Sequence, residues 1–202
     1  YRATKGLADK FSDLSGNTDQ RALFTTSVFG TSSGQIAIPS VGDFKNGLHV
    51  KKFVNLRSDS VAVSDPTTEF ADTDFPVFRL SEMYLIYAES VLRGGSGGDA
   101  GAALEYINKI RSRAYGGSTA GNFTNADMTL QTILDERSRE LYWEGHRRTD
   151  LIRYGQLTSG DYLWPWKGGV ANGTAVDAKF NLFPIPSANR ASNPNLSQNS
   201  GF

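Results

Sequence analysis

The side chains that could carry out acid–base chemistry are densest between positions 132 and 155, where the sequence reads TILDERSRELYWEGHRRTDLIRYG. Glu136, Glu140 and Glu144 recur every four residues, so a helix would align them on one face. Two carboxyls that lie roughly 5–10 Å apart across a cleft, one of them with a raised pKa, can hydrolyse a glycosidic bond. The stretch therefore raises the hypothesis of a glycoside hydrolase.

Arginines argue against that hypothesis. The stretch holds five acids and five arginines: Asp135, Glu136, Glu140, Glu144 and Asp150, with Arg137, Arg139, Arg147, Arg148 and Arg153. Neighbouring arginines lower the pKa of a carboxylate, whereas a general acid needs a raised one. Interleaved opposite charges on a helix contribute only about 0.2–0.5 kcal/mol per pair. We therefore favour an ion-paired helix, partly buried under loops, and predict no catalytic residue.

Hydrophobic spacing predicts a helical hairpin before this stretch. Residues 79–92 are apolar nearly all round, which indicates a helix buried on most faces, and Gly94 and Gly95 follow it as a stop signal. Asp99 stands where an N-cap belongs, and a second helix is predicted over 99–117, so that residues 79–115 form an antiparallel helical hairpin. Its apolar face is Ala103, Ile107, Ile110 and Ala114.

A third helix is predicted to begin near positions 125–129, with Leu130, Ile133, Leu134, Leu141 and Tyr142 as its apolar stripe. Gly145 interrupts it, and a shorter helix over 148–154 follows.

Residues 1–75 are broken by Gly, Ser and Pro and are expected to form a long, loop-rich segment with one candidate strand at 49–56. Residues 156–202 are expected to be a loop and an extended tail without a helix. The fold class is mainly α, with a loop-rich lobe and a few short strands.

Composition excludes several kinds of site. Formal net charge is zero, which argues against nucleic acid or an anionic membrane as partner. The chain has no cysteine, so thiol nucleophiles, disulfides and thiolate metal sites are impossible, and two histidines make a histidine-rich metal site unexpected. No metal or cofactor is predicted. The start, YRATKGLADKF, has neither an initiator Met nor a signal-peptide pattern, so we expect a mature protein or a fragment of a longer one.

Four segments, in order, resemble the C-terminal region of the SusD/RagB family of outer-membrane nutrient-binding lipoproteins: RLSEMYLIYAES, AALEYINKIRSRA, ILDERSRELYWEGHRRTDLIRYG and LFPIPSANRASNPNLSQNSGF. The motif RExxxEGHRxxDLxRxG comprises Arg139, Glu140, Glu144, Gly145, His146, Arg147, Asp150, Leu151, Arg153 and Gly155. The resemblance covers about the last 125 residues. Before them only DQRALF (19–24) and HVKKF (49–53) echo the family.

The resemblance implies a fold of tetratricopeptide-like helix pairs plus a loop-rich lobe, an α-α superhelix type. Residues 1–202 would be the family's C-terminal domain: a variable segment at 1–75, a helix pair at 79–115, signature helices at 125–155 and the tail at 156–202. Family members carry an N-terminal half with further repeats and a lipid-bearing cysteine, which this sequence lacks. We therefore expect the isolated chain to be less stable than a whole member or to self-associate.

The resemblance also implies a non-catalytic function. Such proteins bind an oligosaccharide, or in some members a peptide, on the extracellular face of the outer membrane and close over a SusC-like TonB-dependent transporter. Membrane contact would come only through a lipid anchor on the missing N-terminus. In this interpretation Arg139, Glu140, Glu144, Gly145, His146, Asp150 and Arg153 are structural. A glycosidase and a helical-repeat module that binds only protein stay open as alternatives.

Tyr162, Trp164 and Trp166 are the main candidates for ligand binding. Sugar capture uses aromatic rings for the apolar faces of pyranoses, and these three share one Gly/Pro-containing loop. The alternative, which we favour, is that they anchor the loop to the protein, as loop aromatics commonly do. Phe29, Phe44 and Asn46 are weaker candidates. The family's ligand contacts come largely from loops upstream of position 79, so the sequence does not identify the glycan or peptide.

Overall fold

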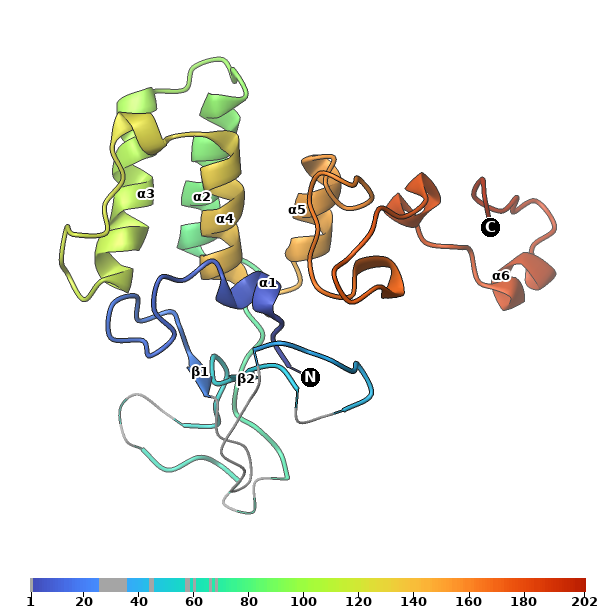
Figure 1. The fold of residues 1–202 in the computed structure, drawn as a ribbon, viewed down its shortest axis with the longest axis horizontal. Helices are drawn as coiled ribbons and strands as arrows, with labels where there is room; N and C mark the ends of the chain where they lie inside the picture. The colour runs from blue at the N-terminus through green and yellow to red at the C-terminus, as the bar shows by residue number, and fades with distance from the viewer. Residues whose placement is uncertain are drawn as a thin grey trace. The chain divides into compact units, whose positions relative to one another are not determined.

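The computed structural model describes residues 2–25, 36–43, 46–56, 59, 61–65, 67 and 69–202. The chain is mainly helical, as predicted (Figure 1). It forms two compact units, Tyr1–Arg147 and Arg148–Phe202. The helices are α1 (Lys5–Ala8), α2 (Leu80–Leu92), α3 (Ala100–Ala114), α4 (Leu130–Leu141), α5 (Arg147–Arg153) and α6 (Ser187–Ser192); the short 3-10 turns are η1 (Asn125–Asp127), η2 (Lys167–Gly169) and η3 (Ala178–Asn181).

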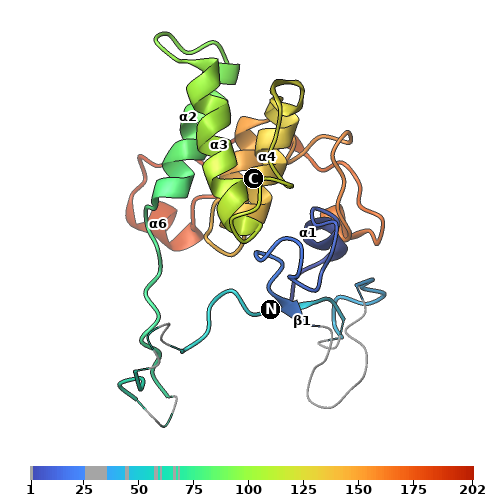
Figure 2. The same ribbon diagram turned by 90° about the vertical axis from the view of Figure 1, so that its left-hand side faces the viewer.

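Three helices form the main body of the first unit. Figures 1 and 2 both show α2, α3 and α4 side by side. Their shared core consists of Leu85, Ala88, Ala103, Ile107, Ile110, Ile133 and Leu141. The apolar spacing predicted for the second helix is confirmed, because Ala103, Ile107, Ile110 and Ala114 are all buried. Asp99 caps α3 by accepting a hydrogen bond from the Ala102 amide, at 2.6 Å.

One line of α2 faces outward. Leu85 and Ala88 are fully buried, but Leu80, Met83 and Ile86 are 64%, 42% and 42% exposed. These three positions recur every three residues, so they follow one edge of the helix. The prediction that this helix is buried on most faces holds for the sides toward α3 and α4 and fails along this edge.

The end of α4 differs from the prediction. The helix ends at Leu141 rather than at Gly145, because Tyr142 adopts an extended backbone with ψ 143°. The Tyr142 ring stacks on Phe24 with ring centroids 5.7 Å apart, and its hydroxyl donates to the Arg21 carbonyl at 2.7 Å. Tertiary packing of one side chain thus stops the helix one turn early. Gly145 then turns the chain with φ +82°, a value that favours glycine.

The N-terminal segment contributes more core than its loop-rich sequence predicts. A second hydrophobic cluster consists of Ala3, Ala8, Phe11, Ala22, Leu48, Val50 and Tyr142. Within it, β1 (Phe24–Thr25) pairs antiparallel with β2 (His49–Val50). The strand expected over 49–56 is therefore only two residues long. This cluster holds the N-terminal segment against the C-terminal end of α4 through Tyr142.

The second unit carries a loop after α5 and a C-terminal tail. The tail contains the short helix α6, which the prediction of an extended tail missed. Side-chain amides, rather than a β-ladder, hold the backbone of the tail: Gln198 donates to the Ile185 carbonyl and accepts from the Ile185 amide, and Asn199 donates to the Phe183 carbonyl.

No helix among the described residues has the length and apolar character needed to cross a membrane.

Candidate functional site

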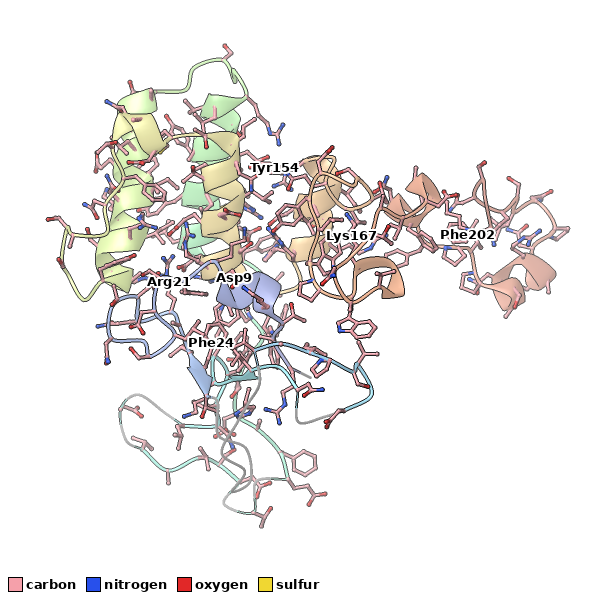
Figure 3. All side chains as sticks on the ribbon, viewed as in Figure 1. Asp9, Arg21, Phe24, Tyr154, Lys167 and Phe202 are labelled. Carbon is pink, nitrogen blue, oxygen red and sulfur yellow. The ribbon has the colours of Figure 1, made fainter. Side chains whose placement is uncertain are left out.

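The acids of the signature region form the centre of a buried charge cluster, which we call the signature cluster. Its carboxylates are Asp19, Glu136, Glu140 and Glu144, and its cations are Arg21, Lys52, Arg79, Arg111, Arg113 and Arg139. Figure 3 labels Arg21, which lies where the segment between α1 and β1 meets the end of the helix bundle. All ten residues belong to the first unit.

Glu136 lies at the deepest point of the signature cluster, with a side chain that is 0% exposed. Its Oε1 accepts from Arg21 Nη1 at 2.7 Å, and its Oε2 accepts from Arg111 Nη1 at 2.7 Å and from Arg139 Nε at 2.8 Å. Burial would raise the pKa of Glu136, but the charges of these arginines outweigh it and lower the pKa. Glu136 is therefore a buried carboxylate that stays ionised.

Glu140 joins three different segments to α4. Its carboxylate accepts from Arg113 Nη2 at 2.6 and 2.7 Å and from Arg21 Nη1 at 3.2 Å, and it also pairs with Arg79. Burial opposes the charge, but the hydrogen bond from Arg79 and the surrounding arginine charges lower the pKa of Glu140 to about 2. The segment at 21, the start of α2 and the end of α3 thus meet at one carboxylate.

Glu144 receives two basic side chains. Arg79 donates to it in a bidentate arrangement, and the Lys52 ammonium donates to Oε1. Lys52 also donates to the carbonyls of Glu140 and Tyr142, at 2.8 and 2.9 Å. Those carbonyls lie at the C-terminal end of α4, where cations are favoured by the helix dipole. The pKa of Glu144 is lowered despite its burial, by the bonds from Arg79 and Lys52.

This electrostatic arrangement is the reverse of what glycoside hydrolysis needs. A general acid must hold a proton near neutral pH, so its pKa must be raised. The pKa of Glu136, of Glu140 and of Glu144 is lowered in each case. These carboxylates can hold cations in place, but they are not arranged to deliver a proton.

The rest of the signature region lies near the helix ends. His146 Nδ1 is 3.5 Å from Glu82 Oε1 of α2. Asp150 is buried and pairs with Arg153 of the same helix at 3.0 Å. Gly145 supplies the positive φ described above. Within the described residues, no group of three or more His, Cys, Asp or Glu side chains is arranged to hold a metal ion.

The aromatic loop of the second unit is organised around one buried lysine. Lys167, labelled in Figure 3, is 2% exposed, and its ammonium donates to the carbonyls of Gln156, Ser159 and Tyr162 at 3.2, 2.5 and 2.8 Å. The ammonium also lies 4.6 Å from the Trp164 ring centroid. Burial lowers the pKa of Lys167. The loop therefore has a polar centre that its sequence did not reveal.

The predicted ligand-binding residues are divided between the two units. Tyr162 and Trp164 lie together, with ring centroids 6.1 Å apart and planes inclined by 52°. Trp166 directly precedes η2 and has a left-handed conformation with φ +70°. Asn46, in the first unit, is buried and donates its side-chain amide to the Ser40 carbonyl at 3.1 Å. Phe29 and Phe44 lie outside the described residues.

Comparison with known proteins decides the family. A family model described as the SusD family matches residues 25–202, which is most of the chain. The chain belongs to the SusD family. It is 42% identical over 186 residues to the starch-binding protein SusD of Bacteroides thetaiotaomicron, which covers 91% of this chain and 31% of that protein. The family match therefore begins well before the last 125 residues on which the sequence resemblance rested.

Two solved structures are similar to the fold of this chain. A SusD superfamily protein from Bacteroides vulgatus is 29% identical, with a TM-score of 0.59 over 92% of this chain and 36% of that one. Surface glycan-binding protein A from Bacteroides thetaiotaomicron, in complex with laminarihexaose, is 30% identical, with a TM-score of 0.51 over 64% of this chain and 25% of that one. The chain thus spans about a third of the length of the starch-binding SusD and of the Bacteroides vulgatus protein.

Sequence reasoning found three of the four carboxylates of the signature cluster, Glu136, Glu140 and Glu144, but not Asp19 and not most of the cations. Of the six cations of the signature cluster, only Arg139 lies within residues 132–155. The other five come from elsewhere in the chain, so helical spacing could not identify them. A signal was present in two short family echoes. DQRALF contains Asp19 and Arg21, and HVKKF contains Lys52. Arg21 pairs with Glu136 and Lys52 pairs with Glu144, whereas Asp19 pairs with Arg21.

Proposed function

We propose that this chain is part of a cell-surface protein that binds oligosaccharides without cleaving them. The observation that carries the proposal is its 42% identity, over 91% of its length, to the starch-binding protein SusD. A related surface glycan-binding protein whose structure includes laminarihexaose adds support. The lowered pKa of Glu140 argues against this residue as the general acid of a hydrolase.

Within this chain, the proposed contact surface is the loop with Tyr162, Trp164 and Trp166. Its aromatic side chains are half-buried rather than fully buried, so part of each ring surface meets solvent. The Lys167 ammonium fixes the backbone at three carbonyls, so the loop is ordered before a ligand arrives. An ordered aromatic loop loses less conformational entropy on binding than a loose one.

The test is titration calorimetry with starch-derived and laminarin-derived oligosaccharides, and with short peptides as a third series. Binding of a saccharide without the release of reducing ends supports the proposal. Binding of peptides only would replace the glycan with a peptide ligand. Steady release of reducing sugar would contradict a non-catalytic function, and a folded chain that binds none of the three series would contradict ligand binding by this chain.

The contribution of the loop is tested in the same experiment. The double variant Trp164→Ala, Trp166→Ala is compared with Phe78→Ala, which removes an exposed aromatic side chain outside the loop. We expect about a tenfold or greater loss of affinity in the first variant, because stacking on an aromatic ring contributes about 0.5–1.5 kcal/mol beyond area burial. No loss should occur in the second. Equal affinities in both variants would contradict a sugar platform on this loop.

Membership of the SusD family also supports a proposed partner and location. The partner is a SusC-like TonB-dependent transporter, and the location is the extracellular face of the outer membrane. Co-purification of the chain with its cognate transporter in the absence of glycan tests the partnership. Association that occurs without saccharide would show that the protein contact is independent of the ligand, and a complete absence of association would contradict a transporter contact by this part of the protein.

A further inference from the structure

The chain leaves α4 through a tight turn that places a tryptophan in an unfavourable backbone conformation. Tyr142 has φ −60° and ψ 143°, Trp143 has φ +64°, and the Glu144 amide donates to the Leu141 carbonyl at 3.1 Å. These values fit a type II turn, in which the third residue needs a positive φ and is usually Gly or Asn. Trp143 is the third residue of this turn, which we call the signature turn.

The residues on either side of Trp143 fix the signature turn. The Tyr142 ring stacks on Phe24, and the Glu144 carboxylate pairs with two basic side chains. A glycine between them would adopt the same backbone without steric cost, whereas a bulky side chain at positive φ is strained. Such strain persists where the surrounding structure enforces it, and it clusters at functional sites. The needs of the fold therefore do not explain a tryptophan at this position.

Contacts inside the protein do not explain the Trp143 side chain either. It is 42% exposed, and neither a hydrogen bond nor a ring contact joins it to another of the described residues. The Trp164 ring, by contrast, lies 6.1 Å from the Tyr162 ring and 4.6 Å from the Lys167 ammonium. A Cβ on the neighbouring Gly145 would meet no atom within 4 Å, so there is open space beside the turn. Trp143 thus presents an aromatic surface and an indole N–H to solvent.

The surroundings of Trp143 suit a saccharide better than a protein surface. A tryptophan that anchors a protein partner lies at the centre of a well-packed apolar patch. The residues that follow Trp143 in the chain are instead Glu144, Gly145 and His146, and the His146 side chain is 21% exposed. An indole offers its apolar face to the C–H groups of a pyranose ring, and its Nε1–H can donate to a hydroxyl.

We propose that Trp143 is a second saccharide platform of this chain, on which one pyranose ring stacks. The inference rests on the proposed binding of oligosaccharides and adds a contact in the first unit, separate from the aromatic loop of the second. The ligand class is a neutral oligosaccharide, because stacking and an N–H donor require no charge on the ligand. The anchored neighbours of Trp143 hold the turn in place before a ligand binds, so little conformational entropy is lost.

The test is titration calorimetry of the chain with maltoheptaose and with laminarihexaose. Trp143→Gly and Trp143→Ala should each weaken the binding about tenfold or more, because both remove the ring. Trp143→Phe keeps an aromatic ring and should retain most of the affinity. The matched control is Phe70→Ala, which removes another exposed aromatic side chain and should change the affinity less than about twofold.

Thermal unfolding of the same variants measures the strain at position 143. Trp143→Gly should melt about 2–4 °C above Trp143→Ala, because only glycine accepts a positive φ without steric cost. This order is the reverse of the one expected at an ordinary backbone position, and it also shows that both variants are folded. Equal melting temperatures would show that the position is not strained and would remove the reason for a retained ring.

The outcomes separate this proposal from the proposed function. A folded chain that binds neither saccharide would contradict both. A chain that binds a saccharide with equal affinity before and after Trp143→Gly and Trp143→Ala would overturn the Trp143 platform alone. Unchanged saccharide affinity combined with lost co-purification of the transporter would assign Trp143 to a protein partner and would likewise overturn the proposal.

Discussion

Arg79 and Glu144, which are 65 positions apart, form a bidentate pair with Nε–Oε2 and Nη2–Oε1 distances of 2.6 and 2.8 Å. Arg79 precedes α2 and Glu144 follows α4, so the pair joins the two ends of the helix bundle that lie farthest apart in sequence. The same arginine also pairs with Glu140. The glutamates of the signature motif therefore pair with basic side chains from distant segments of the chain, and we expect these pairs to hold the segments together.

Glu140→Gln should lower the stability of the chain. It leaves three arginines facing a neutral group in a buried site, and breaking a buried ion pair costs about 3–5 kcal/mol. Urea unfolding of the two proteins at pH 7 measures the difference. The control is Glu105→Gln, whose pair with Lys109 is more than half exposed and should give no measurable change. Unchanged stability with altered ligand specificity would contradict a structural role for Glu140.

Stability should fall in acid. The pKa of Glu140 is lowered to about 2 from an unfolded value of 4.5, so its contribution is fully present above pH 4.5 and is lost as the pH falls through 2. The shift corresponds to about 3 kcal/mol. Denaturant unfolding measured at intervals between pH 6 and pH 2 should show this decline, and Glu140→Gln should flatten it. Equal slopes for both proteins would assign the acid sensitivity to other groups.

Gly145→Ala should destabilise the turn after α4. Gly145 has φ +82°, and an added Cβ would meet no atom within 4 Å, so the cost is conformational only. The left-handed region costs other residues about 1–2 kcal/mol. Gly42→Ala, at a glycine without positive φ and with ordinary contacts for a Cβ, serves as the control in the same thermal unfolding series. A neutral Gly145→Ala would show that the turn relaxes.

Lys167→Met should loosen the aromatic loop. The change keeps an unbranched apolar stem but removes the ammonium, which leaves the carbonyls of Gln156, Ser159 and Tyr162 without this donor. An unsatisfied buried polar group costs about 1–3 kcal/mol. Hydrogen exchange should rise in residues 156–176 and stay unchanged in α3. Lys51→Met, at an exposed lysine of the first unit, should leave the loop protected.

The exposed line of α2 should cause the isolated chain to self-associate, since contiguous apolar surface favours association. Leu80, Met83 and Ile86 form this line. Sedimentation velocity over a range of concentrations should detect larger species, and Met83→Glu with Ile86→Glu should reduce them. Ser90→Glu adds a charge at a neighbouring exposed position and should have less effect. A chain that is monomeric at all concentrations would contradict this prediction.

Local patterns in the sequence determined the helices. The spacing of Ala103, Ile107 and Ile110 and the cap at Asp99 depend on contacts within a few residues, and the structure confirms both. The quoted motifs also indicated the family. The arginine-rich stretch predicted lowered carboxylate pKa values, and this direction is right, but the arginines that lower the pKa of Glu140 lie at positions 21, 79 and 113.

Tertiary structure alone decided which residues are partners. Glu140 pairs with Arg79 and Arg21, which are 61 and 119 positions away, and no helical period can predict such a distance in sequence. The early end of α4 depends on the packing of Tyr142 against Phe24, and the aromatic loop depends on three carbonyls that converge on Lys167. The ion pairs, the end of α4 and the order of the aromatic loop each depend on whether contacts with distant segments outweigh the cost of desolvation. Those contacts form only when the chain is folded.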